Sequence, residues 1–170
     1  MQQQGFTLIE LVVTMAVLVS VSTIAIPAFQ TSIGNAQVRT VAESIRNGLQ
    51  QARAEAIKRN ARVKMTLEQN SAYQVGCVTV TPNCPALIAQ KSAIEGSSSN
   101  ITVTADHNTA VFGSFGTRDA ATPIALTVVN VSNTQVRSEE LRALRVILTP
   151  GGNIKVCDPS VTENGDSRKC

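Results

Sequence analysis

The chain opens with a long apolar segment. Between Phe6 and Phe29, 17 of the 24 residues are Ala, Val, Ile, Leu, Met or Phe. After Glu10, no charged residue appears until Arg39. Because about 20 apolar residues suffice to cross a bilayer, we expect residues 6–29 to form a transmembrane helix.

The helical pattern continues through residues 30–59, but only one face stays apolar. Apolar residues recur there at three- and four-residue steps, although Gly34 and Asn35 weaken the helix. Pro27 lacks the N–H that a helix interior needs, so we expect a kink at this position. The apolar stripe consists of Val38, Val41, Ala42, Ile45, Leu49, Ala52 and Ala56.

After Asn60 the pattern changes from helical to alternating. Val63, Met65 and Leu67 alternate with polar residues, as in a half-buried strand. Pro150-Gly151-Gly152 predicts a hairpin turn between the last two strands. Further strands are predicted at residues 73–80, 100–105, 110–115, 124–131, 144–148 and 153–157. Because no helices intervene, we expect an α+β fold with the long helix packed on an antiparallel β-sheet.

Composition adds a prediction about the cysteines. The 170 residues allow one domain plus an appendage, and a net charge of +3 does not by itself argue for nucleic acid. The cysteine spacings do not fit a zinc site, so we predict no metal. Four cysteines predict two disulfides in an oxidising compartment. Of the three pairings, short loop closure favours Cys77–Cys84 and Cys157–Cys170, and the second bridge would contribute about 3 kcal/mol.

The start of the apolar segment differs from a secretory signal peptide. Its leader, Met1-Gln2-Gln3-Gln4-Gly5, has no Lys or Arg, and the apolar run is too long for such a signal. Glu10 needs a partner inside an apolar helix. Cleavage between Gly5 and Phe6 would place a new α-amino group about one helical turn from Glu10. The string Gly5-Phe6-Thr7-Leu8-Ile9-Glu10 closely resembles the class III signal of type IV pilins and type II secretion pseudopilins.

This resemblance implies specific roles for residues in the segment. A prepilin peptidase is expected to cut between Gly5 and Phe6, after which Phe6 is methylated and Glu10 sets the subunit register. A proline near Pro27 is also typical of pilins. The implied parts are a leader peptide (1–5), a transmembrane or filament-core helix (6–29), an amphipathic continuation of the helix (30–59), and an antiparallel β domain with a disulfide-closed C-terminal loop (60–170).

The expected location is the bacterial inner membrane, with a single span and the C-terminal domain in the periplasm, and later the pilus at the cell surface. Arg39 and Arg46 lie beyond the span and favour the opposite orientation by the positive-inside rule. We give more weight to the disulfides, which need an oxidising side, and to the cleavage motif, which needs a peptidase facing the cytoplasm.

Two later stretches, residues 112–116 and the hairpin at residues 145–157, resemble minor pilins and pseudopilins of the FimT, FimU and GspH kind. The terminal Cys157–Cys170 loop is most similar to FimU-like minor pilins. The resemblance implies a minor pilin of a type IV pilus that acts in assembly priming or at the tip. Its expected partners are other major and minor pilins, the prepilin peptidase and the inner-membrane assembly platform. A GspH-type minor pseudopilin of type II secretion is an alternative.

The sequence does not favour an enzyme. His107 is the only histidine, and Asp106 beside it would face the opposite way on a strand. A Ser/His/Asp arrangement would therefore need distant partners. There is no glycine-rich phosphate loop in a strand–turn–helix context, so we predict no catalytic residues and no cofactor.

A DNA-binding minor pilin for natural transformation is the other alternative. Some FimT-like pilins bind DNA through arginines of the C-terminal region, and the matching candidates here are Lys155, Arg168 and Lys169. Three acidic residues among the last 13 offset these charges, whereas a phosphate-contacting surface should be strongly positive. DNA binding is therefore kept as an alternative that the sequence does not favour.

Overall fold

The computed structural model describes residues 7–92, 98–122 and 124–170. Its largest element is the helix α1, Leu8–Arg59, whose 52 residues span about 78 Å. Thr7 caps its start, because its Oγ1 accepts a hydrogen bond from the Glu10 N–H at 3.4 Å. Asn60 ends it in the left-handed conformation, with φ of 48°.

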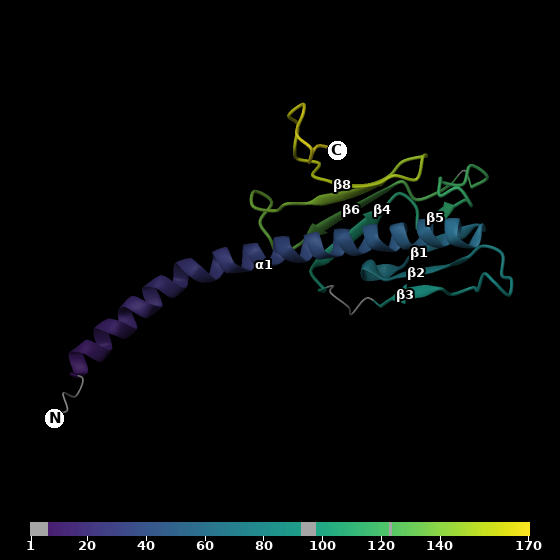
Figure 1. The fold of residues 1–170 in the computed structure, drawn as a ribbon. Coiled ribbons are helices and arrows are strands. Elements are labelled where there is room, and N and C mark those ends of the chain that lie inside the picture. Colours follow the sequence, from purple (N-terminus) through teal and green to yellow (C-terminus); the bar gives the residue numbers. More distant parts are fainter. Residues whose placement is uncertain (1–6, 93–97, 123) are drawn as a thin grey trace, which may run out of the picture.

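The two halves of α1 have different surroundings. Its first half projects away from the folded domain in a gentle curve and ends far from it (Figure 1). Its second half crosses the front of the strands, and the predicted stripe from Val38 to Ala56 is completely buried. The helix continues through position 27, and the predicted kink there remains a prediction.

The strands form two four-stranded antiparallel sheets. The first has the order β3-β2-β1-β5 and the second has the order β4-β6-β7-β8. Both sheets contact α1, and in Figure 1 β1, β2 and β3 lie below the helix while β6 and β8 lie above it. Their bounds are β1 Val63–Leu67, β2 Tyr73–Cys77, β3 Ala89–Lys91, β4 Ile101–Ala105, β5 Thr109–Phe112, β6 Val128–Asn133, β7 Leu144–Leu148 and β8 Ile154–Cys157, with a short 3-10 turn at Gln69–Ser71.

One buried cluster joins the helix to both sheets. Phe112 and Met65 come from the first sheet, Val129 and Leu148 from the second, and Leu126 from the loop before β6; each is at most 2% exposed. This shared core means that α1 and the sheets fold as one unit.

The expectation of one sheet needs correction, as do several strand ends. The described residues form two sheets, and β3 was not predicted. β2 ends at Cys77 rather than at residue 80, because the Cys77 N–H donates to Pro85 O as the chain folds back. β5 ends at Phe112 rather than at residue 115, because a turn begins at Gly113, where the Gly116 N–H donates to Gly113 O.

β6 also differs from its predicted range, 124–131, since it covers Val128–Asn133. The carboxylate of Asp106 accepts hydrogen bonds from the N–H groups of Thr127 and Val128, at 3.0 and 3.2 Å. The Leu126 N–H donates to Thr109 O. These hydrogen bonds engage the N–H groups of Leu126, Thr127 and Val128. The regular pairing of β6 with β7 therefore begins at Val128 and not at residue 124.

Candidate assembly site

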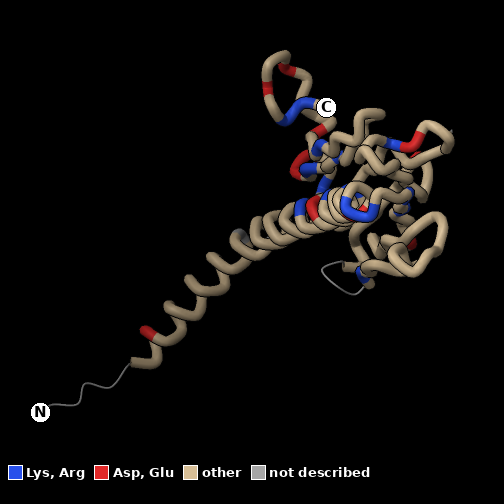
Figure 2. Tube along the Cα trace, turned by 45° about the vertical axis from the view of Figure 1, so that its right-hand side comes forward, with Lys and Arg blue, Asp and Glu red and all other residues tan. Residues whose placement is uncertain are grey.

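The exposed half of α1 is the first candidate site. From Leu8 to Ile33, its large apolar side chains are between 50% and 81% exposed in the described residues. Glu10 is the first charged residue of α1, and the next along the chain is Arg39 (Figure 2). An 18-residue window of this helix has a mean hydropathy of 2.3 and is 0% buried, so by length and composition it could span a membrane. Gly5 and Phe6 lie outside the described residues.

Polar side chains in this half bond within the helix. Ser20 Oγ donates to Ala16 O at 2.8 Å, and Ser22 Oγ donates to Leu18 O at 2.7 Å. Each hydroxyl is therefore satisfied in a segment that would otherwise present it to lipid or to apolar partners.

The helix is fastened to the domain where its exposed half ends. Asn35 donates from Nδ2 to Glu140 O and accepts at Oδ1 from the Arg142 N–H, both at 2.9 Å. Thr31 Oγ1 donates to Glu140 Oε2 at 2.7 Å. In the sequence, Gly34 and Asn35 stand out only as helix-weakening residues, and this weakening is the one local signal of a contact here.

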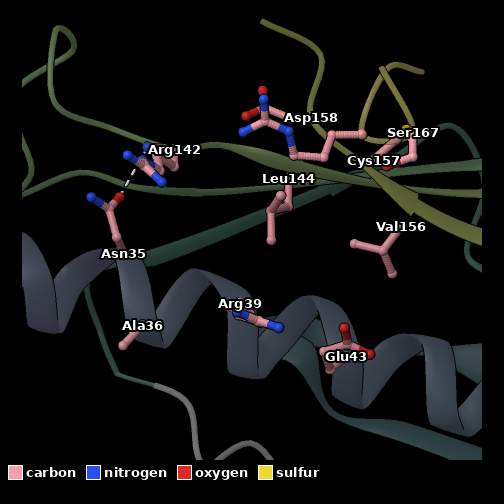
Figure 3. Close-up of a pocket in the computed structure, with 11 residues that line it drawn as sticks. Asn35, Ala36, Arg39, Glu43, Arg142, Leu144, Val156, Cys157, Asp158 and Ser167 are labelled. Atoms are coloured by element: carbon pink, nitrogen blue, oxygen red, sulfur yellow. Dashed lines mark hydrogen bonds between the residues drawn. The ribbon is translucent and has the colours of Figure 1, made fainter. Parts of the chain in front are cut away.

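A groove of about 530 Å³ lies between α1 and the edge strand β8. Figure 3 shows Leu144 and Val156 pointing from the sheet toward the helix, with Arg39 on the helix and Arg142 on the opposite wall. These four residues, with Ala36, Asn35, Glu43, Cys157, Asp158, Ser167 and Arg168, line what we call the α1–β8 groove. This groove could not be predicted from the sequence, because its walls come from distant segments.

Both predicted pairs of cysteines are joined, Cys77 to Cys84 and Cys157 to Cys170. The second disulfide closes the C-terminal loop, residues 158–170, which rises above β8 (Figure 1). The Asp158 N–H donates to Arg168 O at 2.7 Å, which holds the loop against the end of β8.

The candidate DNA contacts of this loop are occupied by local partners. Arg168 contacts both carboxylate oxygens of Asp166, with an ion pair of 2.7 Å. Hydrogen bonds from Arg168 lower the pKa of Asp166 to about 2. Lys155 Nζ donates to Lys169 O at 2.6 Å, and Lys169 Nζ donates to Asn164 Oδ1 at 2.7 Å. The loop therefore presents balanced charges rather than a bare cationic surface.

Asp106 and His107 lie in the turn after β4. Their side chains do not face opposite ways, as expected for a strand, since His107 Nδ1 is 3.9 Å from Asp106 Oδ2. Partial burial raises the pKa of Asp106, but hydrogen bonds from Thr127, Val128 and His107 outweigh it and the pKa is lowered. This carboxylate fixes the main chain. Within the described residues, no three His, Cys, Asp or Glu side chains are placed to hold a metal ion.

Comparisons with known proteins agree with this architecture. The family described as type II transport protein GspH matches residues 41–152, and the prokaryotic N-terminal methylation motif matches residues 1–26. None of the curated proteins that were compared matches the chain.

Two solved structures share the fold. One is the type IV minor pilin FimU of Pseudomonas aeruginosa strain PAO1, with 15% identity, a TM-score of 0.53, and coverage of 75% of this chain and 96% of FimU. The other is the minor pseudopilin EpsH from the type 2 secretion system of Vibrio cholerae, with 12% identity, a TM-score of 0.51, and coverage of 74% of this chain and 99% of EpsH.

The family match, the methylation motif at the start of the chain and the fold shared with FimU and EpsH place the chain among the minor pilins and pseudopilins. These proteins are structural subunits that work with other pilins. The GspH match covers well over half of this sequence, and the chain belongs to the GspH family.

Proposed function

We propose that the chain is a minor pilin that acts in priming the assembly of a type IV pilus or at its tip. The observation that supports this most is the apolar half of α1, which is exposed along its length while the rest of the chain forms a folded domain. A surface of this kind is stable only in lipid or against other apolar helices. Membrane storage followed by insertion into a filament provides both environments.

Processing is the first step of the proposal. Prepilin peptidase cuts between Gly5 and Phe6, and the new N-terminal Phe6 is methylated. Glu10 then faces an α-amino group, of its own chain or of a neighbouring subunit, and their attraction sets the subunit register. Pro27 permits a bend between the filament core and the domain.

The proposed location follows from the same parts. The helix holds the chain in the inner membrane with the domain in the periplasm, where the two disulfides are stable. The assembly platform then transfers the subunit, with other major and minor pilins, into a pilus at the cell surface. The chain has a non-catalytic role and needs no cofactor.

The test expresses the full chain, or a variant of it, in a host strain whose chromosomal copy of the gene has been deleted. We expect mass spectrometry to find a mature chain that begins with methylated Phe6, and we expect Gly5→Val to prevent cleavage. Glu10→Gln should be cleaved but enter sheared pili about tenfold less. The control, Thr14→Val, removes a hydroxyl that donates only to Leu11 O and should enter normally. Normal piliation with Glu10→Gln would contradict the proposal.

A second candidate is a minor pseudopilin of type II secretion, which the match to the GspH family favours. The physical role of α1 is the same in both systems, so a deletion strain is needed to separate them. Loss of protein secretion with normal pili would identify the pseudopilin, and loss of pili with normal secretion would identify the pilin.

DNA binding is not part of the proposal. Arg168 is paired with Asp166, and the ammonium groups of Lys155 and Lys169 donate hydrogen bonds to acceptors in the C-terminal loop. A surface that releases counterions from DNA needs cations that are free to contact phosphates. The purified chain should therefore show no salt-sensitive DNA binding that depends on Arg168 and Lys169.

A further inference from the structure

The α1–β8 groove has an unpaired strand edge along one side. The Leu148 N–H points to β6, where it donates to Thr127 O, and the Thr149 N–H points to the hairpin partner, Asn153 O. Because antiparallel pairs alternate, the main-chain groups of Lys155 and Cys157 face β7. Those of Ile154 and Val156 face away from the sheet, since β8 is its edge strand.

The C-terminal loop covers only one end of this edge. The Asp158 N–H donates to Arg168 O, and Asp158 pairs with Lys169 in a parallel bridge. Ile154 and Val156 remain open to an added strand, with room for about two residues before the loop begins. Exposed edges of this kind pair readily with extended chains.

The floor of the groove is apolar and its rim is charged. Leu144 and Val156 are half-buried and point toward α1 (Figure 3). Arg39 and Arg142 stand on opposite walls, and neither guanidinium has an ion pair or side-chain hydrogen bond in the ranges that the structure describes.

Two of the other rim charges are paired with an opposite charge, and Asp158 keeps its negative charge. Glu43 pairs with Arg46 at 3.1 Å, and Arg168 pairs with Asp166. Asp158 accepts a hydrogen bond from the Ser160 N–H at 2.9 Å. Arg39 and Arg142, which have no ion pair among the described residues, outnumber Asp158 and leave the groove with an excess of positive charge.

We infer that the α1–β8 groove binds an extended segment of a neighbouring pilin subunit that carries at least one Asp or Glu. The segment pairs with the open edge at Ile154 and Val156, its apolar side chains rest on Leu144 and Val156, and its carboxylate lies between Arg39 and Arg142. This inference rests on the proposed function, because it needs the chain to stand beside other pilins.

A protein segment fits the groove better than a nucleic acid does. Main-chain groups of a strand edge are matched by another peptide main chain. A nucleic acid would need a wider cationic surface than Arg39 and Arg142 provide. An apolar floor between them suits aliphatic side chains.

The test is photocrosslinking of the full chain in cells that assemble the filament. Ala36, an exposed residue of the groove wall, is replaced by p-benzoylphenylalanine, and adducts are identified by mass spectrometry. We expect an adduct with one pilin subunit, through a peptide that contains Asp or Glu. The double variant Arg39→Gln with Arg142→Gln should reduce this adduct about tenfold.

Two controls make the outcome decisive. Lys64→Gln with Arg118→Gln removes the same charge away from the groove and should leave the Ala36 adduct unchanged. The photoreactive residue at Val17, in the exposed half of α1, reports entry into the filament. Val17 adducts without Ala36 adducts, or Ala36 adducts that persist in the arginine variant, would overturn the inference. If the photoreactive residue gives no adduct with a pilin at Ala36 or at Val17, in chains that carry no other substitution, the proposed function itself would be overturned.

Discussion

Asn35 accepts a hydrogen bond from the Arg142 N–H at 2.9 Å, across 107 positions of the sequence. The same side chain donates to Glu140 O, so one amide satisfies two main-chain groups of the loop between β6 and β7. This contact lies where α1 leaves the domain, and it holds the helix to the loop between β6 and β7.

We expect Asn35→Ala to lower the free energy of unfolding by about 1–2 kcal/mol. It removes two hydrogen bonds of the helix–loop contact, while the better helix propensity of Ala offsets part of that loss. Urea unfolding of the full chain in detergent, followed by the fluorescence of Tyr73, measures the change. Asn47→Ala alters an exposed residue of the same helix and should change stability by less than about 0.5 kcal/mol. Equal effects of the two variants would contradict this account.

Gly34 allows α1 to lie directly against the loop between β6 and β7. A Cβ at this position would be 2.3 Å from Val136 Cγ2, so Gly34→Ala should destabilise the domain by about 1–3 kcal/mol despite the higher helix propensity of Ala. Val136→Ala removes the clashing methyl groups, so combining the two substitutions should recover most of the loss. A double-mutant cycle by urea unfolding measures the coupling, and simple additivity would show that the close approach has no energetic consequence.

The helix could be predicted well from the sequence because its signals are local. The stripe from Val38 to Ala56 repeats at helical steps, and every residue of it is buried. The contacts of Gly34 and Asn35 could not be predicted, because their partners are about 100 positions away. A glycine and an asparagine inside a helical pattern indicate only that something beyond propensity is acting.

The sheets show the same limit. The hairpin β7–β8 follows from its turn, whereas β1 pairs with β5 across more than 40 residues, with Met65 opposite Ala110. Alternation predicts that strands exist but does not choose their partners, and so it could not separate one sheet from two. The α1–β8 groove depends on that choice, since it exists only because β8 is an edge strand.

Gly152 and Gly151 provide a matched pair at the tip of the β7–β8 hairpin. Gly152 has φ of 80°, and a Cβ there would be 2.0 Å from Gly116 O, while a Cβ at Gly151 meets nothing within 4 Å. Gly152→Ala should therefore cost at least about 2 kcal/mol of stability, and Gly151→Ala should change it by less than about 0.5 kcal/mol. Urea unfolding compares the two, and similar effects would mean that the hairpin does not pack on the Gly113–Gly116 turn.

Asp106 should make part of the domain's stability sensitive to acid. Its pKa is lowered in the folded state by hydrogen bonds from Thr127, Val128 and His107, whereas in the unfolded chain it returns to about 3.9. A carboxylate with a lowered folded pKa stabilises the protein above the unfolded value, and this contribution disappears as the pH falls through the folded value. We therefore expect Asp106→Asn to destabilise the domain by about 1 kcal/mol at pH 7, since solvent weakens bonds to an exposed carboxylate.

The difference between Asp106→Asn and the unaltered protein should shrink as the pH falls below about 4 and vanish below the folded pKa. Urea unfolding at a series of pH values measures this convergence. Glu139→Gln removes one exposed carboxylate and serves as the charge-matched control, with an expected change of less than about 0.5 kcal/mol at pH 7. A constant difference between Asp106→Asn and the unaltered protein at every pH would show that the substitution acts through packing. In that case the start of β6 would not depend on the charge of Asp106.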